Sequence, residues 1–304
     1  MKNKTIDRPI FLVGVPRSGT TIIFEALSTH DDLSWFSNWL TKYPKIPIVS
    51  LLSRLTNFNL LRGAKQSSFN SHVLRKYLPH PDECYPVWEA LLGKKFLYRF
   101  LTDKISHENE KIATTNYIKK VMLYHGKKRF AAKLTGPAHI TFLNSIFSDA
   151  IFVHVIRDGR AVIQSLLKVP FWEKGGGLHK PWWTDGLREE DIDIYNRFNK
   201  NPIVLAAVQW RRIIYAARSE SKRLSGNRYF ELKYENFICD PYGAIEKLIE
   251  NCSLKSSSRI CNYMKKIEYK NMNYKYKDFF VKENNDLLHN IIGDLLRELG
   301  YYNH

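Results

Sequence analysis

The sequence predicts an α/β fold, a single three-layer domain with a central parallel sheet and helical insertions. Two observations carry this prediction. Residues 9–14 and residues 150–156 are apolar runs that are too short for helices and suit strands buried on both faces. Each run leads through a short loop into a segment of helical periodicity, and this order of strand, loop and helix is typical of βαβ units.

The remaining segments fit between and around these units. Residues 129–134 and residues 228–237 are further strand candidates, and an amphipathic helix is expected over 286–302. Residues 31–130 show mostly helical periodicity and little strand pattern, so they predict a helical insertion. Residues 170–202 hold three consecutive glycines, three tryptophans and several prolines, which predicts a loop that covers or binds an acceptor.

Composition narrows the class of protein. The 304 residues are 44% apolar and 25% charged, which excludes disorder as the main state, and no linker or repeat divides residues 1–304, so we expect one domain. The balance of 47 basic and 30 acidic residues gives a net charge of +17, which favours an anionic partner: nucleic acid, a membrane surface or a small polyphosphate. No apolar stretch approaches the roughly 20 residues that cross a bilayer, and no signal peptide pattern precedes the first strand. We therefore expect no stable membrane insertion and a cytoplasmic location.

The cysteines and histidines give no sign of a metal site. Cys84, Cys239, Cys252 and Cys261 are too few and too widely spaced for a disulfide framework, so we interpret them as reduced thiols. Neither a CxxC pair nor a histidine motif with ligand spacing is present in the sequence. We expect no protein-bound metal.

The first candidate anion site lies between the strand at 9–14 and the helix that follows it. It contains Arg17 and the run Ser18, Gly19, Thr20 and Thr21. Backbone amides of such a turn, together with the positive end of the next helix, form a cradle for a phosphate-like group. The hydroxyls and the arginine add donors. The pattern GxxxxG is followed by threonine, where a Walker A loop has lysine. The alternative to an anion site is that this segment is an ordinary tight βα turn.

The second candidate site has the same context, at the end of the strand 150–156. Arg157 opens the sequence RDGR, and Ser165 follows on the next helix. In a parallel sheet both loops emerge at the carboxyl ends of the strands, where open α/β sheets bind ligands. The two sites together predict a ligand with two separated anionic groups. The alternative is that Arg157 and Asp158 pair with each other across the loop.

These motifs in this order resemble the PAPS-dependent sulfotransferases, in particular the branch that includes bacterial and tyrosylprotein sulfotransferases. The resemblance rests on VPRSGTT at 15–21, the segment 133–160 with VIRDGRAVIQS continuing to 165, LKYENFICDP at 232–241 and LGY at 299–301. It implies a P-loop-type domain that uses PAPS as donor and releases adenosine 3′,5′-bisphosphate without a metal.

The resemblance also implies roles for individual residues. Arg17, Ser18, Gly19, Thr20 and Thr21 match the loop that holds the 5′-phosphosulfate. Arg157 and Ser165 match the pair that binds the 3′-phosphate. Lys133 stands where the tyrosylprotein branch has a lysine close to the sulfuryl group, and we expect it to stabilise charge on the bridging oxygen.

The general base is the point at which the sequence departs from the family. The tyrosylprotein and carbohydrate branches have a glutamate about twenty residues after the first arginine, whereas residues 35–39 here contain no carboxylate. The segment LPHPDECYPVW offers Glu83, which resembles a Pro-x-Glu of bacterial relatives, and His80, whose ordinary pKa of about 6.5 suits a base. We favour Glu83, then His80; Asp82 and Glu89 are weaker candidates. The alternative for Glu83 is an ordinary loop or helix-capping carboxylate.

The predicted function is sulfuryl transfer from PAPS to a hydroxyl or amine of a small-molecule or carbohydrate acceptor. A P-loop kinase is the first alternative, and it needs a lysine at position 20, where the chain has threonine. The second is a non-catalytic module that binds nucleic acid or another polyanion, which leaves both strand-end loops unexplained. A PAPS-binding pseudoenzyme without a base is the third. The sequence specifies neither the acceptor nor the oligomeric state.

Overall fold

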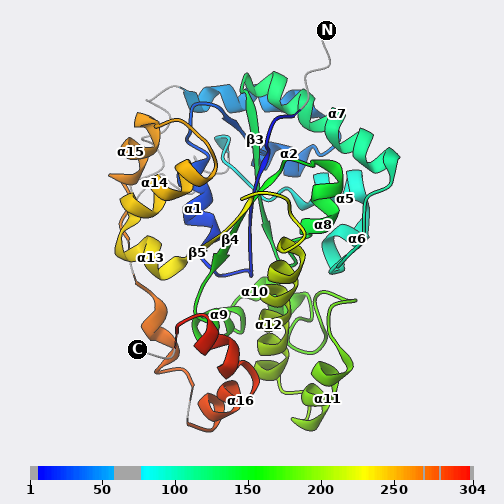
Figure 1. Ribbon diagram of the computed structural model, residues 1–304, viewed down its shortest axis with the longest axis vertical. Coiled ribbons are helices and arrows are strands. Elements are labelled where there is room, and N and C mark those ends of the chain that lie inside the picture. The colour runs from blue at the N-terminus through cyan, green and yellow to red at the C-terminus, as the bar shows by residue number, and fades with distance from the viewer. Residues whose placement is uncertain (1–5, 58–76, 270, 281, 302–304) are drawn as a thin grey trace.

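A five-stranded parallel sheet forms the centre of the molecule, with strands in the order β2-β3-β1-β4-β5 (Figure 1). The structure, a computed structural model, describes residues 6–57, 77–269, 271–280 and 282–301. The strands are β1 (Ile10–Gly14), β2 (Leu33–Ser34), β3 (Arg129–Thr135), β4 (Ile151–Ile156) and β5 (Tyr229–Lys233). The apolar runs at 9–14 and 150–156 are thus adjacent parallel strands, which confirms the predicted α/β class.

Both faces of β1 are buried. Alternate side chains of a strand point to opposite faces of the sheet, and in β1 both sets of side chains are covered. Ile10 and Leu12 pack on one side and Phe11 and Val13 on the other. Helices on either side complete the three layers (Figure 1). The first face is covered by α1 (Thr20–Leu27), α13 (Tyr234–Cys239), α14 (Pro241–Asn251) and α15 (Ser258–Met264). The second is covered by α2 (Asn38–Lys42), η1 (Pro47–Asn57), α5 (Tyr85–Leu92), α6 (Lys94–Tyr98), α7 (Glu108–His125) and α8 (Ile140–Ile146).

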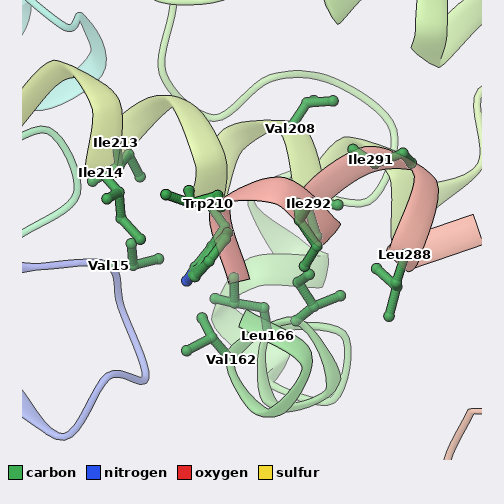
Figure 2. Packing of buried hydrophobic residues seen from close by; sticks show 14 of the residues in the cluster. Val15, Val162, Leu166, Val208, Trp210, Ile213, Ile214, Leu288, Ile291 and Ile292 are labelled. Carbon is green, nitrogen blue, oxygen red and sulfur yellow. The ribbon is translucent and has the colours of Figure 1, made fainter. Parts of the chain in front are cut away.

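A third cluster of buried side chains lies beyond the carboxyl ends of the strands, and it supports both strand-end loops. Its elements are α9 (Gly159–Leu166), α10 (Pro170–Lys174), α12 (Pro202–Ser221), η2 (Asn273–Tyr276) and α16 (Lys282–Glu298). Figure 2 shows the Trp210 indole of α12 pointing toward Val162 and Leu166 of α9, with Ile292 of α16 beside it. A Cβ atom at Gly159 would lie 2.9 Å from the Trp210 ring, so glycine lets α9 begin directly against this indole. Val15 of the first loop packs on the same cluster.

Three segments differ from their predicted structure. Residues 31–130 contain the short strand β2, in which Leu33 pairs with Arg129 of β3. Residues 170–202 are not a continuous loop, since they include α10 and α11 (Glu189–Arg197). The strand predicted over 228–237 ends at Lys233, and α13 follows at once. The two-residue β2 and the five-residue α10 leave little periodicity in a sequence, and α11 spans only nine residues.

In the parts of the chain that the structure describes, we find no helix with the length and apolar character needed to cross a bilayer. The four cysteines are free thiols, with Cys84 and Cys252 buried and Cys239 and Cys261 exposed.

Candidate active site

The loop between β1 and α1 is shaped by two glycines. A Cβ atom at Gly14 would lie 2.6 Å from the carbonyl oxygen of Val155 in β4. Gly19 has a φ of 85°, and a Cβ atom there would lie 2.2 Å from the ring of Tyr234. The loop is therefore pressed between the neighbouring strand and α13. Its amides lead directly into the amino end of α1 at Thr20, where the helix dipole favours an anion.

Arg17 joins the first loop to the second. Its Nε donates to Ser165 Oγ over 2.9 Å, and its carbonyl oxygen accepts from Arg157 Nη1 over 2.8 Å. Arg17 itself has a φ of 75°, a left-handed conformation that costs a non-glycine residue free energy and is often found at functional sites. The two loops thus meet at one edge of the sheet, as the parallel strands predict.

Arg157 is held by uncharged partners. Its Nε donates to Asn273 Oδ1 over 2.8 Å, and its guanidinium lies over the Tyr234 ring at 4.5 Å from the centroid. Burial lowers the pKa of Arg157, although an arginine stays charged throughout the physiological range. Asp158 bonds instead with the Arg160 guanidinium and caps α9. The interpretation in which Arg157 and Asp158 pair across the loop is therefore wrong, and the charge of Arg157 remains available for an anion.

The side chains of the first loop fit an anionic ligand. The Ser18 hydroxyl is buried and has no hydrogen-bond partner among the described residues, a state that costs about 1–3 kcal/mol. An anionic oxygen bound in this loop, which also contains Arg17, would satisfy it. A doubly anionic nucleotide that spans the two loops meets this requirement.

Lys133 and Glu83 form an ion pair at the floor of the site. Lys133 lies on β3 and its Nζ is 3.0 Å from Glu83 Oε1 and 2.9 Å from Thr21 Oγ1. Thr135, two residues further along the same strand, donates to Glu83 Oε2 over 3.0 Å. Lys133 therefore bridges the Glu83 carboxylate and Thr21 of the first loop. A carboxylate within reach of the donor loop has the placement that a general base needs.

The other candidate bases have different surroundings. His80 Nδ1 lies 3.1 Å from the carbonyl oxygen of Leu78, and its backbone is bonded to Asn38. Asp82 accepts from the Thr41 hydroxyl over 2.6 Å and from the backbone amide of Glu83 over 2.8 Å, so it shapes the turn. Of these groups only Glu83 lies among the described residues that line the cleft beside the first loop.

This cleft has a volume of about 450 Å³, within the range of small-molecule sites. It extends from the first loop past Glu83 to a wall of aromatic side chains. Its described lining residues are Pro16, Arg17, Thr20, Thr21, Glu83, Tyr85, Leu97, Tyr98, Thr135, Phe171, Trp172, Trp182 and Trp183. Segment 170–202 therefore supplies one wall of the cleft, in the position expected for an acceptor loop.

The glycines of that segment hold the tryptophans in place. A Cβ atom would lie 2.0 Å from the Trp182 ring at Gly175 and 2.6 Å from the Trp172 ring at Gly177. Trp172 and Trp182 stack with centroids 5.3 Å apart and planes 11° apart. Trp172 and Trp183 are buried, whereas Trp182 is half-buried. The segment therefore packs on the core and also lines the cleft.

Comparison with known proteins agrees with this geometry. A family model with the description "Sulfotransferase family" matches residues 9–258, a range that includes both loops and all five strands. The chain belongs to the sulfotransferase family. Two curated relatives of this sulfotransferase are the omega-hydroxy-beta-dihydromenaquinone-9 sulfotransferases Stf3 of Mycobacterium bovis and Mycobacterium tuberculosis. Each is 23% identical over 282 residues, and the match covers 82% of this chain and 63% of the relative's length.

Solved structures show the same fold. The sulfotransferase STF9 from Mycobacterium avium aligns over 97% of this chain and 78% of its own, with a TM-score of 0.62 and 16% identity. STF1 from Mycobacterium tuberculosis aligns over 90% of this chain and 76% of its own, with a TM-score of 0.55 and 17% identity. At this level of sequence identity, the structural likeness shows the fold and nothing more.

Four side chains around the second loop were assigned no ligand role from the sequence. Glu235 accepts from the Asp158 amide over 3.1 Å and from Tyr301 over 2.8 Å, and it also bonds Asn273. Tyr234 lies against both Arg157 and the position of Gly19. These residues hold the two strand-end loops together. Tyr234 and Glu235 directly follow β5, whereas Asn273 and Tyr301 come from distant segments, so no local pattern in the sequence indicates these contacts.

Proposed function

We propose that this sulfotransferase moves a sulfuryl group from PAPS to a hydroxyl or amine acceptor and releases adenosine 3′,5′-bisphosphate. The observation that carries the proposal is the contact of the two strand-end loops through Arg17, Ser165 and Arg157. It joins two cationic sites at one edge of the sheet. A nucleotide with a 3′-phosphate and a 5′-phosphosulfate has its anionic groups separated in the way such a pair of sites requires.

Each loop would hold one end of the donor. Arg17, Ser18, Gly19, Thr20 and Thr21 would bind the 5′-phosphosulfate through loop amides, hydroxyls and the guanidinium. On the other side, Arg157 and Ser165 would bind the 3′-phosphate.

In the transfer step, the acceptor oxygen or nitrogen forms a bond to sulfur while the bond from sulfur to the bridging phosphate oxygen breaks. The electron pair of the broken bond stays on that oxygen, where Arg17 and Lys133 would stabilise the developing charge. Glu83 would take the acceptor proton. Because a sulfuryl group carries less charge than a phosphoryl group, the two cations can supply this stabilisation without a metal ion.

The acceptor is proposed at the level of a hydroxyl-bearing small molecule or carbohydrate. The names of the two curated relatives specify an omega-hydroxylated dihydromenaquinone as their acceptor. A hydroxyl is therefore the first group to test as the nucleophile of this chain, and an amine the second.

Thermal denaturation with candidate ligands tests the donor assignment. Adenosine 3′,5′-bisphosphate at a hundred times its Kd adds about 2.7 kcal/mol to stability, which raises Tm by several degrees, and EDTA should leave this shift unchanged. Arg157→Ala should abolish the shift. The control Arg223→Ala, which removes an exposed ion pair with Asp103, should retain it.

Other outcomes contradict the proposal. Stabilisation by ATP only when magnesium is present would indicate a kinase, for which Thr20 is the wrong residue. Steeply salt-dependent binding to nucleic acid, with no response to the bisphosphate, would indicate a polyanion-binding module. Binding of PAPS without turnover of any acceptor would indicate a pseudoenzyme.

A further inference from the structure

The acceptor half of the cleft is formed by apolar side chains from two separate segments. Leu97 and Tyr98 end α6 on one side, and Phe171 and Trp182 lie on or after α10 on the other. Phe171 and Tyr98 are each 48% exposed, so both present large aromatic surfaces beside the cleft. Apolar surface gathered in this way is typical of a binding site.

Backbone hydrogen bonds connect the two sides of the acceptor half. The amide of Thr184 donates to the carbonyl of Tyr98 over 2.8 Å, and the amide of Phe100 donates to the carbonyl of Thr184 over 3.0 Å. The amide of Trp182 donates to Gln209 of α12 over 2.8 Å. Behind these contacts, Trp172 supports the stacked Trp182 ring. Because these contacts hold the aromatic side chains in place, little side-chain entropy is lost when an apolar skeleton binds between them.

The acceptor half of the cleft has no charged side chain among its described lining residues. Arg17 and Glu83 are the charged residues of the described lining; Arg17 lies on the first loop, and Glu83 is paired with Lys133. An anionic acceptor would therefore bring a charge that no lining cation of the acceptor half offsets.

The hydroxyls near the base already have partners. The Tyr85 hydroxyl and the Thr135 hydroxyl are 2.7 Å apart, and the Thr135 hydroxyl also bonds Glu83. The many hydroxyls of a sugar would lose water here and gain few partners, which costs free energy for each unpaired group. A single hydroxyl on an apolar skeleton avoids that cost.

We infer that the acceptor of this site is an uncharged, apolar alcohol or phenol, with its hydroxyl at Glu83 and its carbon skeleton between Tyr98, Phe171 and Trp182. The inference rests on the proposed function, because it assumes that sulfuryl transfer takes place beside Glu83. It narrows the acceptor from any hydroxyl or amine compound to one class.

The first experiment compares acceptors by the release of adenosine 3′,5′-bisphosphate from PAPS. The probes are 2-naphthol as the apolar alcohol, N-acetylglucosamine as the sugar and an acidic tyrosine peptide as the anion. We expect kcat/KM for 2-naphthol to exceed the other two by about 100-fold, given the apolar surface that becomes buried.

The second experiment locates the binding surface. Phe171→Ala should raise KM for 2-naphthol by about 10-fold and leave kcat and binding of the bisphosphate unchanged, since the lost contact is apolar. Phe198→Ala removes a partly exposed phenylalanine at the end of α11 and serves as the matched control, with no change expected. Quenching of tryptophan fluorescence by 2-naphthol in the presence of the bisphosphate measures binding without turnover, and Trp182→Phe should reduce it.

The results separate the inference from the proposed function. If the bisphosphate binds and the sugar or the acidic peptide is the preferred acceptor, the inference is overturned and the proposed function stands. If KM responds equally to Phe171→Ala and Phe198→Ala, the inference is also overturned. If neither the bisphosphate nor PAPS binds, the proposed function fails and the inference fails with it.

Discussion

At the scale of single residues, the chemistry depends on one carboxylate held between an ammonium and a hydroxyl. Glu83 contacts Lys133 through one oxygen and Thr135 through the other, and each distance is 3.0 Å. Lys133 reaches Thr21 of the donor loop as well. Any change at one of these residues would therefore alter both the proposed base and the loop proposed to hold the sulfuryl group.

Glu83→Gln should reduce kcat by about 10²-fold or more and leave binding of adenosine 3′,5′-bisphosphate close to normal, because the amide keeps the shape but cannot accept the proton. Steady-state kinetics and calorimetric titration measure the two quantities. Glu89→Gln, in the second turn of α5, is the control and should behave as the unmodified protein. Unchanged turnover in Glu83→Gln would remove this residue from the mechanism.

Lys133→Met should lower kcat by about 10²- to 10³-fold, the usual effect of losing one donor that stabilises transition-state charge. The double variant with Glu83→Gln should cost less than the sum of the two single changes, because the residues contact each other. Lys128→Met, which removes an exposed ion pair with Asp32, is the control. Strict additivity would indicate that the two residues act independently.

At the scale of elements, short segments from distant parts of the chain form the site. Asn273 of η2 bonds Arg157 across 116 residues of sequence, and Trp183 packs where a Cβ atom at Gly136 would lie, just after β3. In segment 170–202, Gly175 and Gly177 lie where tryptophan rings approach the backbone. These two glycines therefore have a packing role.

Gly177→Ala should test that packing role. Its Cβ atom would lie 2.6 Å from the Trp172 ring, and overpacking of this kind costs about 1–3 kcal/mol, so Tm should fall and KM for the acceptor should rise. Gly293→Ala in α16 is the matched control. Its nearest neighbour, His289, is 3.4 Å away, so the change should be neutral or slightly stabilising. A Tm for Gly177→Ala equal to that of the unmodified protein would contradict the packing argument.

At the scale of the whole molecule, two buried histidines make stability depend on pH. His139 packs on Phe96, and His154 lies in β4 with Nδ1 2.7 Å from the Tyr229 hydroxyl. Burial lowers the pKa of each to about 4, from 6.5 in the unfolded chain. Between these values the unfolded state binds more protons than the folded state, so folding is most favourable above pH 6.5 and weakens as the pH falls toward 4.

The free energy of unfolding should therefore decrease from pH 7 to pH 5, with each histidine contributing on the order of 1–3 kcal/mol over the full range. Urea denaturation at both pH values measures this loss. His154→Gln should show a smaller decrease than the unmodified protein, whatever its stability at pH 7. The control His289→Gln, at an exposed position of α16, should show the full decrease, and equal slopes in the two variants would contradict the argument.

Much of the fold and part of the site follow from local sequence. Short apolar runs predicted the strands β1 and β4. The loop sequences that follow these strands indicated Arg17, Arg157 and Ser165 as candidate site residues. The proline-rich turn before α5 located Glu83. By contrast, β2, α10 and α11 were missed, because elements this short leave a weak periodic signal. The partners of Arg157 were missed as well, since Asn273 and Tyr234 come near only when α13 and η2 fold against the loops.

The α/β class, the two strand-end loops and the sulfotransferase family follow from local sequence alone, because apolar periodicity, glycine placement and loop chemistry are local properties of the chain. Tertiary structure alone decided that Arg17 touches Ser165, that Arg157 stays clear of Asp158, and that Lys133 and Glu83 form a pair. It also decided which tryptophans line the acceptor cleft. Burial and pairing depend on packing between segments that lie far apart in the sequence, and no local pattern records such contacts.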